Sequence, residues 1–151
     1  MKKLIVMVAM SLVVCQSQAQ KIKESEVPQI VKTAFTKAYP TAKEVKWGKE
    51  DGAYEASFDQ NKKDMSVLLD EKGMIKEVET TIAKSELPKA VQNTLAKDYA
   101  GYKIEEAATI LSNGVVTYEA EVEKGEKSFD LIFDKEGKLL KKIEKAGEAK
   151  D

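Results

Sequence analysis

The sequence SEVPQIVKTAFTKAYP at residues 25–40 returns in altered form as SELPKAVQNTLAKDYA at residues 85–100. Pro28 and Pro88 suit the first turn of a helix, because an N–H group at that position has no intrahelical partner. The apolar residues of the first stretch recur at every fourth position, as on one face of a helix: Val27, Val31 and Phe35. Each stretch therefore predicts a helix with one apolar face.

The similarity continues beyond these helices. The offset between the two copies is 60 residues at the helices and 64 where Tyr54-Glu55-Ala56 matches Tyr118-Glu119-Ala120. Two copies of this length are too few to stack as a solenoid, so the pattern indicates a tandem duplication of a small unit. We expect one repeat at residues 20–82, a second at 83–146 and a disordered tail at 147–151.

After each helix the apolar residues alternate with polar ones, which is typical of strands with one buried face. Turn sequences such as Asp51-Gly52 and Asn113-Gly114 separate the strands. The prediction is an α+β fold of two tandem repeats, each one helix packed on a four-stranded antiparallel sheet. Besides the central hairpins, strands are expected at residues 43–47, 74–80, 103–111 and 138–144.

The first residues resemble an export signal rather than part of the fold. Lys2 and Lys3 precede a short apolar run, and Ser17-Gln18-Ala19 fits the cleavage rule of signal peptidase. We expect cleavage of residues 1–19 and a periplasmic location. The alternative is a lipoprotein signal that uses Cys15, but Val14 is a poor fit, because a small residue is wanted before the lipidated cysteine.

Composition narrows the function classes. The chain has no histidine and no arginine, and Cys15 is its single cysteine. Removal of Lys2 and Lys3 with the signal takes the formal net charge from −1 to −3. A mildly acidic chain without arginine is a poor ligand for nucleic acid, because binding there depends on neutralising phosphates. A disulfide is also excluded in the mature chain.

Catalytic and metal-binding patterns are weak in this sequence. It has no phosphate-binding glycine loop and no nucleophile elbow, so we predict that it is not an enzyme and needs no cofactor. The acidic residues Glu119, Glu121 and Glu123 share one strand face and are expected to form a solvated surface. A weak calcium site built from several strands stays open, since Ca²⁺ takes oxygen ligands.

Four residues are candidates for binding a protein partner through the sheet. Trp47 and Tyr102 lie where strands begin, and Leu68 and Ile132 are apolar residues on the otherwise polar face. Aromatic and apolar residues surrounded by polar groups are typical of interfaces. The alternative is structural: Trp47 would cover a core edge, and Leu68 with Ile132 would seal the junction between the repeats.

Several of these motifs resemble a known family. The helix openings Ser25-Glu26-Val27-Pro28 and Ser85-Glu86-Leu87-Pro88, the strand Val45-Lys46-Trp47, the Asp51-Gly52-Ala53-Tyr54-Glu55-Ala56 hairpin and the Asp-x-x-Gly turns look like those of PepSY-like periplasmic proteins of Bacteroides-type bacteria. That family is similar in fold to the beta-lactamase inhibitory protein, in which two helix-plus-sheet modules form a concave sheet surface. The resemblance implies a secreted, inhibitor-like binding protein without catalytic residues. The alternative is an envelope sensor of a small ligand or of calcium.

Overall fold

The computed structural model describes residues 20–50 and 52–145. Nine strands follow one another in chain order in one antiparallel sheet, each hydrogen-bonded to the next. They are β1 (Gln20–Ile22), β2 (Lys43–Glu50), β3 (Ala53–Gln60), β4 (Lys63–Leu69), β5 (Ile75–Thr81), β6 (Lys103–Ser112), β7 (Val115–Lys124), β8 (Lys127–Phe133) and β9 (Leu139–Lys145). The predicted export signal, with Cys15, and the predicted tail lie outside the described residues.

Two helices begin where the repeated sequence predicts them. Helix α1 (Gln29–Ala38) follows Pro28, and α2 (Lys89–Asp98) follows Pro88. Each is preceded by a single 3₁₀ turn, η1 (Glu24–Glu26) and η2 (Lys84–Glu86), whose last glutamate accepts a hydrogen bond from the backbone N–H three residues earlier, at 2.8 and 2.7 Å. The glutamate of each Ser-Glu pair therefore stabilises the turn that precedes the helix.

The predicted fold of two tandem repeats, each one helix on its own four-stranded antiparallel sheet, is wrong, because all nine strands form one sheet. Strand β5, the last strand of the N-terminal half, pairs with β6, the first of the C-terminal half, from Glu77 with Ser112 to Thr81 with Ala108. Strand β1 adds a further strand at the opposite edge. The two halves join because an edge strand carries free backbone N–H and C=O groups, which are satisfied by pairing with another edge.

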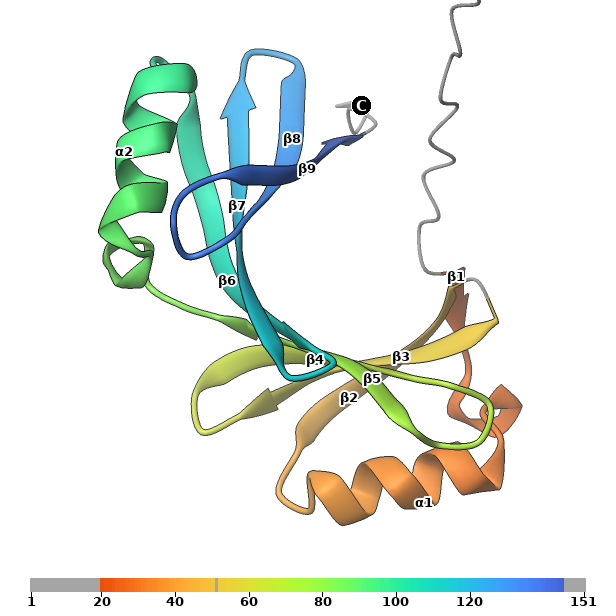
Figure 1. Cartoon of the computed structure of the whole chain (residues 1–151). Coiled ribbons are helices and arrows are strands. Elements are labelled where there is room, and N and C mark those ends of the chain that lie inside the picture. Colours follow the sequence, from red (N-terminus) through yellow and green to blue (C-terminus); the bar gives the residue numbers. More distant parts are fainter. Residues whose placement is uncertain (1–19, 51, 146–151) are drawn as a thin grey trace, which may run out of the picture.

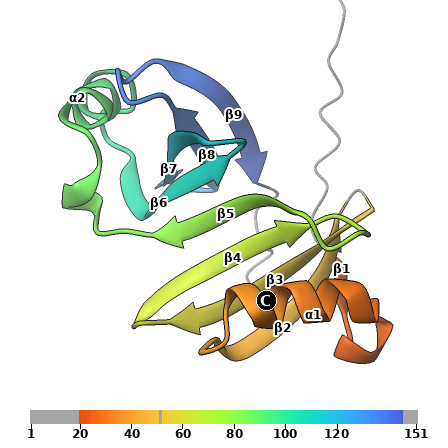
Figure 2. The ribbon, with the colours of Figure 1, turned by 60° about the horizontal axis from the view of Figure 1, so that its bottom comes forward.

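The sheet bends strongly, and both helices lie on its outer side (Figure 1). Helix α1 covers the N-terminal strands, whereas α2 covers the C-terminal strands. Strand β5 runs between the two halves (Figure 2). The opposite side of the sheet, which we call the inner face, carries no helix (Figure 1).

Two apolar clusters hold the helices on the sheet. Val31 and Phe35 of α1 pack against β2–β4, and Val91 and Leu95 of α2 pack against β6–β8. The side chains buried most completely lie where the helices meet the sheet: Val31, Val67, Leu69, Val91, Val122, Leu131 and Phe133. Burial of one such side chain contributes about 1.5–3 kcal/mol to folding.

The hairpin β6–β7 extends further than its counterpart β2–β3. Trp47 pairs with Ala56 in the first hairpin, and the equivalent residues Ala107 and Ala120 pair in the second. More residues separate the pair in the second hairpin than in the first. The ladder of the second hairpin ends with Ser112 opposite Val115. The change of offset noted in the sequence thus lengthens both strands of this hairpin.

Candidate functional site

The inner face is defined by strand register, because residues paired across an antiparallel ladder point to the same side. Glu55 pairs with Leu68, and Leu68 pairs with Glu77. In the other half, Glu119 pairs with Ile132, and Ile132 pairs with Lys141. The alternating neighbours of these residues form the cores under α1 and α2. The inner face is therefore a continuous surface from β3 to β9.

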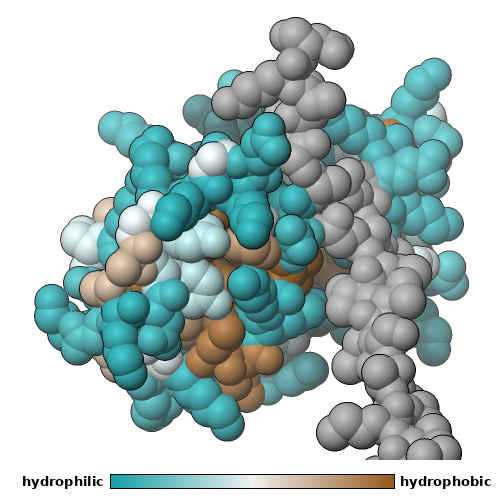
Figure 3. All heavy atoms as spheres, turned by 90° about the horizontal axis from the view of Figure 1, so that it is seen from above, coloured by the Kyte–Doolittle hydropathy of each residue, from teal (hydrophilic) through white to brown (hydrophobic). Residues whose placement is uncertain are grey.

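Apolar residues run through the middle of the inner face. Ala108 and Ile110 on β6 are buried although neither belongs to the core under a helix. Leu68 on β4 and Ile132 on β8 are half-buried. Seen from above, apolar side chains in brown reach the surface between hydrophilic ones in teal (Figure 3). A surface of this mixed kind is typical of protein interfaces.

Acidic residues surround this apolar strip. The bend of the sheet brings together charges from strands that are far apart in the ladder. Burial raises the pKa of Glu77 on β5, and the charge of Lys141 on β9 partly offsets this by lowering it. The ionisable side chains of the central inner face are Glu55, Glu77, Glu79, Glu106, Glu119, Glu121, Asp130, Lys141 and Lys145.

Two of these carboxyls have pKa values far above that of an exposed glutamate. Burial, and then the charge of Glu106, raise the pKa of Glu79 to about 7. Burial, and then the charge of Glu79, raise the pKa of Glu119 to about 8. In the part of the chain that the structure describes, neither carboxyl makes a hydrogen bond or an ion pair with another side chain. Both groups therefore hold a proton at pH values where an exposed glutamate is ionised.

Three other acids of the inner face have partners. Lys145 Nζ lies 2.9 Å from Glu121 Oε2 and 3.7 Å from Asp130 Oδ1. Thr81 Oγ1 donates a hydrogen bond of 2.9 Å to Glu106 Oε1. Glu106, Glu121 and Asp130 thus have polar or charged partners, whereas Glu79 and Glu119 have no hydrogen bond or ion pair with another described side chain.

The expected solvated row of glutamates on β7 differs from the observed one. Glu119 is half-buried with a raised pKa, and the Glu121 side chain is only 23% exposed. Sequence alternation placed these residues on a polar face, but it did not reveal that the bend would remove them from water. Sequence analysis did not consider Glu77 and Glu79, although alternation along β5 puts both acids on the same face of that strand.

The predicted partner-binding residues fall on both sides of the sheet. Trp47 lies in the core under α1, with 7% of its surface exposed, and Tyr102 packs against Tyr99 and Phe129 in the core under α2. Leu68 and Ile132 lie together with the acids on the inner face. A partner contact by any of the four stays a prediction, and only Leu68 and Ile132 lie on the inner face.

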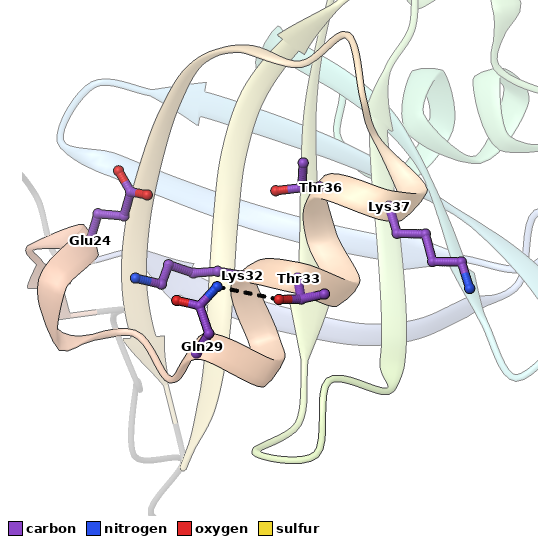
Figure 4. A pocket seen from close by; sticks show the side chains of 6 residues that line it. All are labelled: Glu24, Gln29, Lys32, Thr33, Thr36 and Lys37. Carbon is purple, nitrogen blue, oxygen red and sulfur yellow. Dashed lines mark hydrogen bonds between the residues drawn. The ribbon is translucent and has the colours of Figure 1, made fainter.

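A hollow on the outer side of the molecule runs along α1 (Figure 4). Apart from the half-buried Lys32, its lining side chains are exposed, and Gln29 Nε2 donates a hydrogen bond of 3.3 Å to Thr33 Oγ1. The lining residues are Glu24, Gln29, Lys32, Thr33, Thr36 and Lys37. This hollow offers exposed, solvated side chains rather than a built site.

Two further observations concern metals and membranes. Among residues 20–50 and 52–145, no group of three or more His, Cys, Asp or Glu side chains is placed to hold a metal ion. Neither helix of the described chain has the length and apolar character needed to cross a membrane.

The bent sheet, with both helices on its outer side, is the arrangement to compare with known families. The sequence model of one family, described as "Putative beta-lactamase-inhibitor-like, PepSY-like", matches residues 13–77 and, in a second match, residues 54–141. The chain belongs to this PepSY-like family, as the sequence motifs indicated.

Solved structures of Bacteroides proteins share the fold. A DUF2874 family protein from Bacteroides uniformis is 24% identical, with a TM-score of 0.70 over 78% of this chain and 88% of that one. A protein from Bacteroides eggerthii described as periplasmic is 21% identical, with a TM-score of 0.73 over 82% of this chain and 93% of that one. A BLIP-like protein from Bacteroides fragilis is 23% identical, with a TM-score of 0.64 over 82% and 90%. Among curated proteins, none matches this chain.

Proposed function

We propose that this protein is a periplasmic binding module that engages a protein partner, as an inhibitor does, through the inner face of its sheet. The observation that carries the proposal is the position of both helices on one side of the sheet, which leaves the other side uncovered (Figure 1). Membership of the beta-lactamase-inhibitor-like family supports a binding role. The description of the Bacteroides eggerthii protein as periplasmic supports the location, together with the predicted export signal.

The composition of the inner face also supports contact with a protein. Leu68 and Ile132 provide apolar area that a partner can cover, and the acids around them provide a polar rim. Interfaces typically combine an apolar centre with a charged surround, and hot-spot residues cluster near the centre. Because both helices lie on the other side of the sheet, a partner can contact the inner face without any rearrangement of either helix.

The test is partner capture with variants that change only the inner face. Wild-type protein and a Leu68→Lys, Ile132→Lys double variant are immobilised and exposed to an envelope extract of a Bacteroides species. A control variant carries Ile30→Lys and Leu139→Lys, because these side chains are exposed by 56% and 37% and lie elsewhere. Melting curves first establish that all three proteins are folded.

The expected result is a partner retained by wild type and control and lost from the inner-face variant. Hydrogen exchange of the purified complex should then show protection on β3–β8. Retention by all three proteins, or protection confined to α1 and α2, would contradict the proposal. A partner that binds wild type and control at least tenfold more tightly than the variant would correspond to about 1.4 kcal/mol at these two residues.

A further inference from the structure

We infer that the part of the partner that enters the inner face is cationic: a loop or strand whose lysine or arginine side chains reach the carboxyls of Glu79 and Glu119. The inference rests on the proposed function and adds the chemistry of the partner. It concerns the sheet face as a docking surface, with its apolar strip and its uneven distribution of charge.

The register places the two carboxyls on either side of β6. Glu79 on β5 pairs with Ile110, and Glu119 on β7 pairs with Ala108, which precedes Ile110 by two residues on β6. The two glutamates therefore lie on a diagonal across β6, bordered by the methyl group of Ala108 and the larger side chain of Ile110. The charge of Glu79 reaches Glu119, where it is the largest contribution to the raised pKa after burial.

Of the two lysines of the central inner face, Lys145 is already ion-paired with other acids. Lys145 contacts Glu121 and Asp130 at the β7–β9 side. Lys141 acts on Glu77, whose pKa its charge lowers against the stronger effect of burial. Glu79 and Glu119 have, among the described residues, no lysine within ion-pair distance. A cation supplied by a partner would complete the charge balance of the face.

Energetics favour a cation over a neutral partner. A neutral surface laid over Glu79 and Glu119 would remove the remaining water, and each carboxyl would have to stay protonated or remain buried as an unpaired charge. A lysine or arginine side chain provides an opposite charge and hydrogen-bond donors at once, and arginine can bind a carboxylate with two parallel bonds. Leu68 and Ile132 can accept an apolar side chain beside the cation. The surface is thus complementary to a segment that combines basic and apolar residues.

The electrostatics predict how such binding depends on pH. The pKa of Glu79 is about 7 and that of Glu119 about 8, so both carboxyls gain charge between pH 6 and pH 9. The other charges that act on them are Glu55 from β3, Glu77 from β5, Glu106 from β6, Asp130 from β8 and Lys145 from β9. Affinity for a cationic segment should therefore rise over this range, whereas affinity for a neutral one should fall.

The experiment uses three blocked peptides of equal length: Lys-Ser-Leu-Ser-Lys, Ser-Ser-Leu-Ser-Ser and Glu-Ser-Leu-Ser-Glu. Each is titrated into the purified protein at low ionic strength, at pH 6 and at pH 8.5, and backbone NMR shifts locate the contact. We expect the lysine peptide to bind best, to shift residues of β5–β8 and to bind about tenfold more tightly at pH 8.5. The Glu79→Gln, Glu119→Gln double variant should lose that gain. The Glu136→Gln variant, whose side chain is 65% exposed in a turn, should keep it.

Several outcomes would overturn the inference. One is binding of the lysine peptide no better than of the serine peptide, and another is equal loss in the double variant and the Glu136→Gln control. If the double variant does not fold, the pH series on wild type still decides, because a constant or falling affinity contradicts the inference. A captured partner that needs Leu68 and Ile132 but offers a neutral or acidic segment would contradict this inference alone. A partner that binds the outer side would contradict the proposed function itself.

Discussion

The ring of Trp47 on β2 stands edge-on against the ring of Phe35 on α1, with centroids 5.3 Å apart and planes at 71°. Phe35 makes a second edge contact, with Phe58 on β3, at 5.1 Å. Edge-to-face pairs of this kind add about 0.5–1.5 kcal/mol beyond the burial of their surface. The contact fastens the C-terminal part of α1 to the first long hairpin.

The Trp47→Ala substitution should therefore lower stability. Loss of a buried tryptophan side chain removes about 3 kcal/mol or more, which corresponds to a fall in melting temperature of about 8 °C or more. Circular dichroism melting curves measure the change, with Val45→Ala as the control, since Val45 lies on the same strand with an exposed side chain. Partner capture by the folded fraction tests the alternative role. A variant that melts like wild type but no longer captures its partner would assign Trp47 to the interface.

Gly137 marks a second close contact between a turn and a helix. Its φ is +82°, and a Cβ atom placed there would lie 2.6 Å from the backbone carbon and oxygen of Ala90. The Gly137→Ala substitution forces α2 away from the β8–β9 turn, because backbone atoms cannot move aside as a flexible side chain can. We expect a loss of at least 2 kcal/mol, measured by denaturant unfolding.

Gly114 supplies the matched control for this substitution. Its φ is +77°, but nothing lies within 4 Å of its virtual Cβ. Gly114→Ala should therefore show only the backbone strain, about 1 kcal/mol. Equal destabilisation by the two substitutions would mean that the close approach to Ala90 does not contribute to the free energy lost in Gly137→Ala.

Lys145 occupies the position that a divalent cation would need in order to use Glu121 and Asp130 together. We expect millimolar calcium to leave the melting temperature of the wild-type protein unchanged within 1 °C or so. The Lys145→Met variant should lose about 1 kcal/mol or less at pH 8, because the ion pair is partly exposed to solvent, and calcium should partly restore the loss. A wild-type shift of several degrees at micromolar calcium would support the sensor alternative instead.

The sequence predicted the local structure well, because that structure depends on local patterns. Apolar spacing identified the helices, alternation identified the hairpins, and proline and glycine marked their ends. Leu68 and Ile132 were correctly expected on the polar face of the sheet, since alternation fixes the side to which each residue points.

The sequence did not reveal how the two halves meet. Strand β5 pairs with β6 through backbone hydrogen bonds. Because nearly every residue carries the same backbone N–H and C=O groups, no side-chain pattern predicts this pairing. The bend of the sheet is likewise a property of the whole assembly. Without it, Glu119 is expected to be a solvated acid and nothing in the sequence singles out Glu79. Their burial follows only from the assembled sheet.

Glu79 and Glu119 should make the stability of the protein depend on pH in the opposite sense to ordinary ion-paired acids. Their folded-state pKa values of about 7 and about 8 lie above the usual value of 4.5. As pH rises above 4.5, the unfolded chain releases these protons first, so stability falls until the folded-state pKa values are passed. The Glu119→Gln and Glu79→Gln variants should therefore match wild type near pH 4.5 and exceed its stability at pH 8.5, by roughly 2 kcal/mol each. Urea unfolding across pH 4.5–8.5 measures this difference, with Glu136→Gln as the exposed control. Profiles that stay parallel to that of wild type would show that both carboxyls are hydrated in solution.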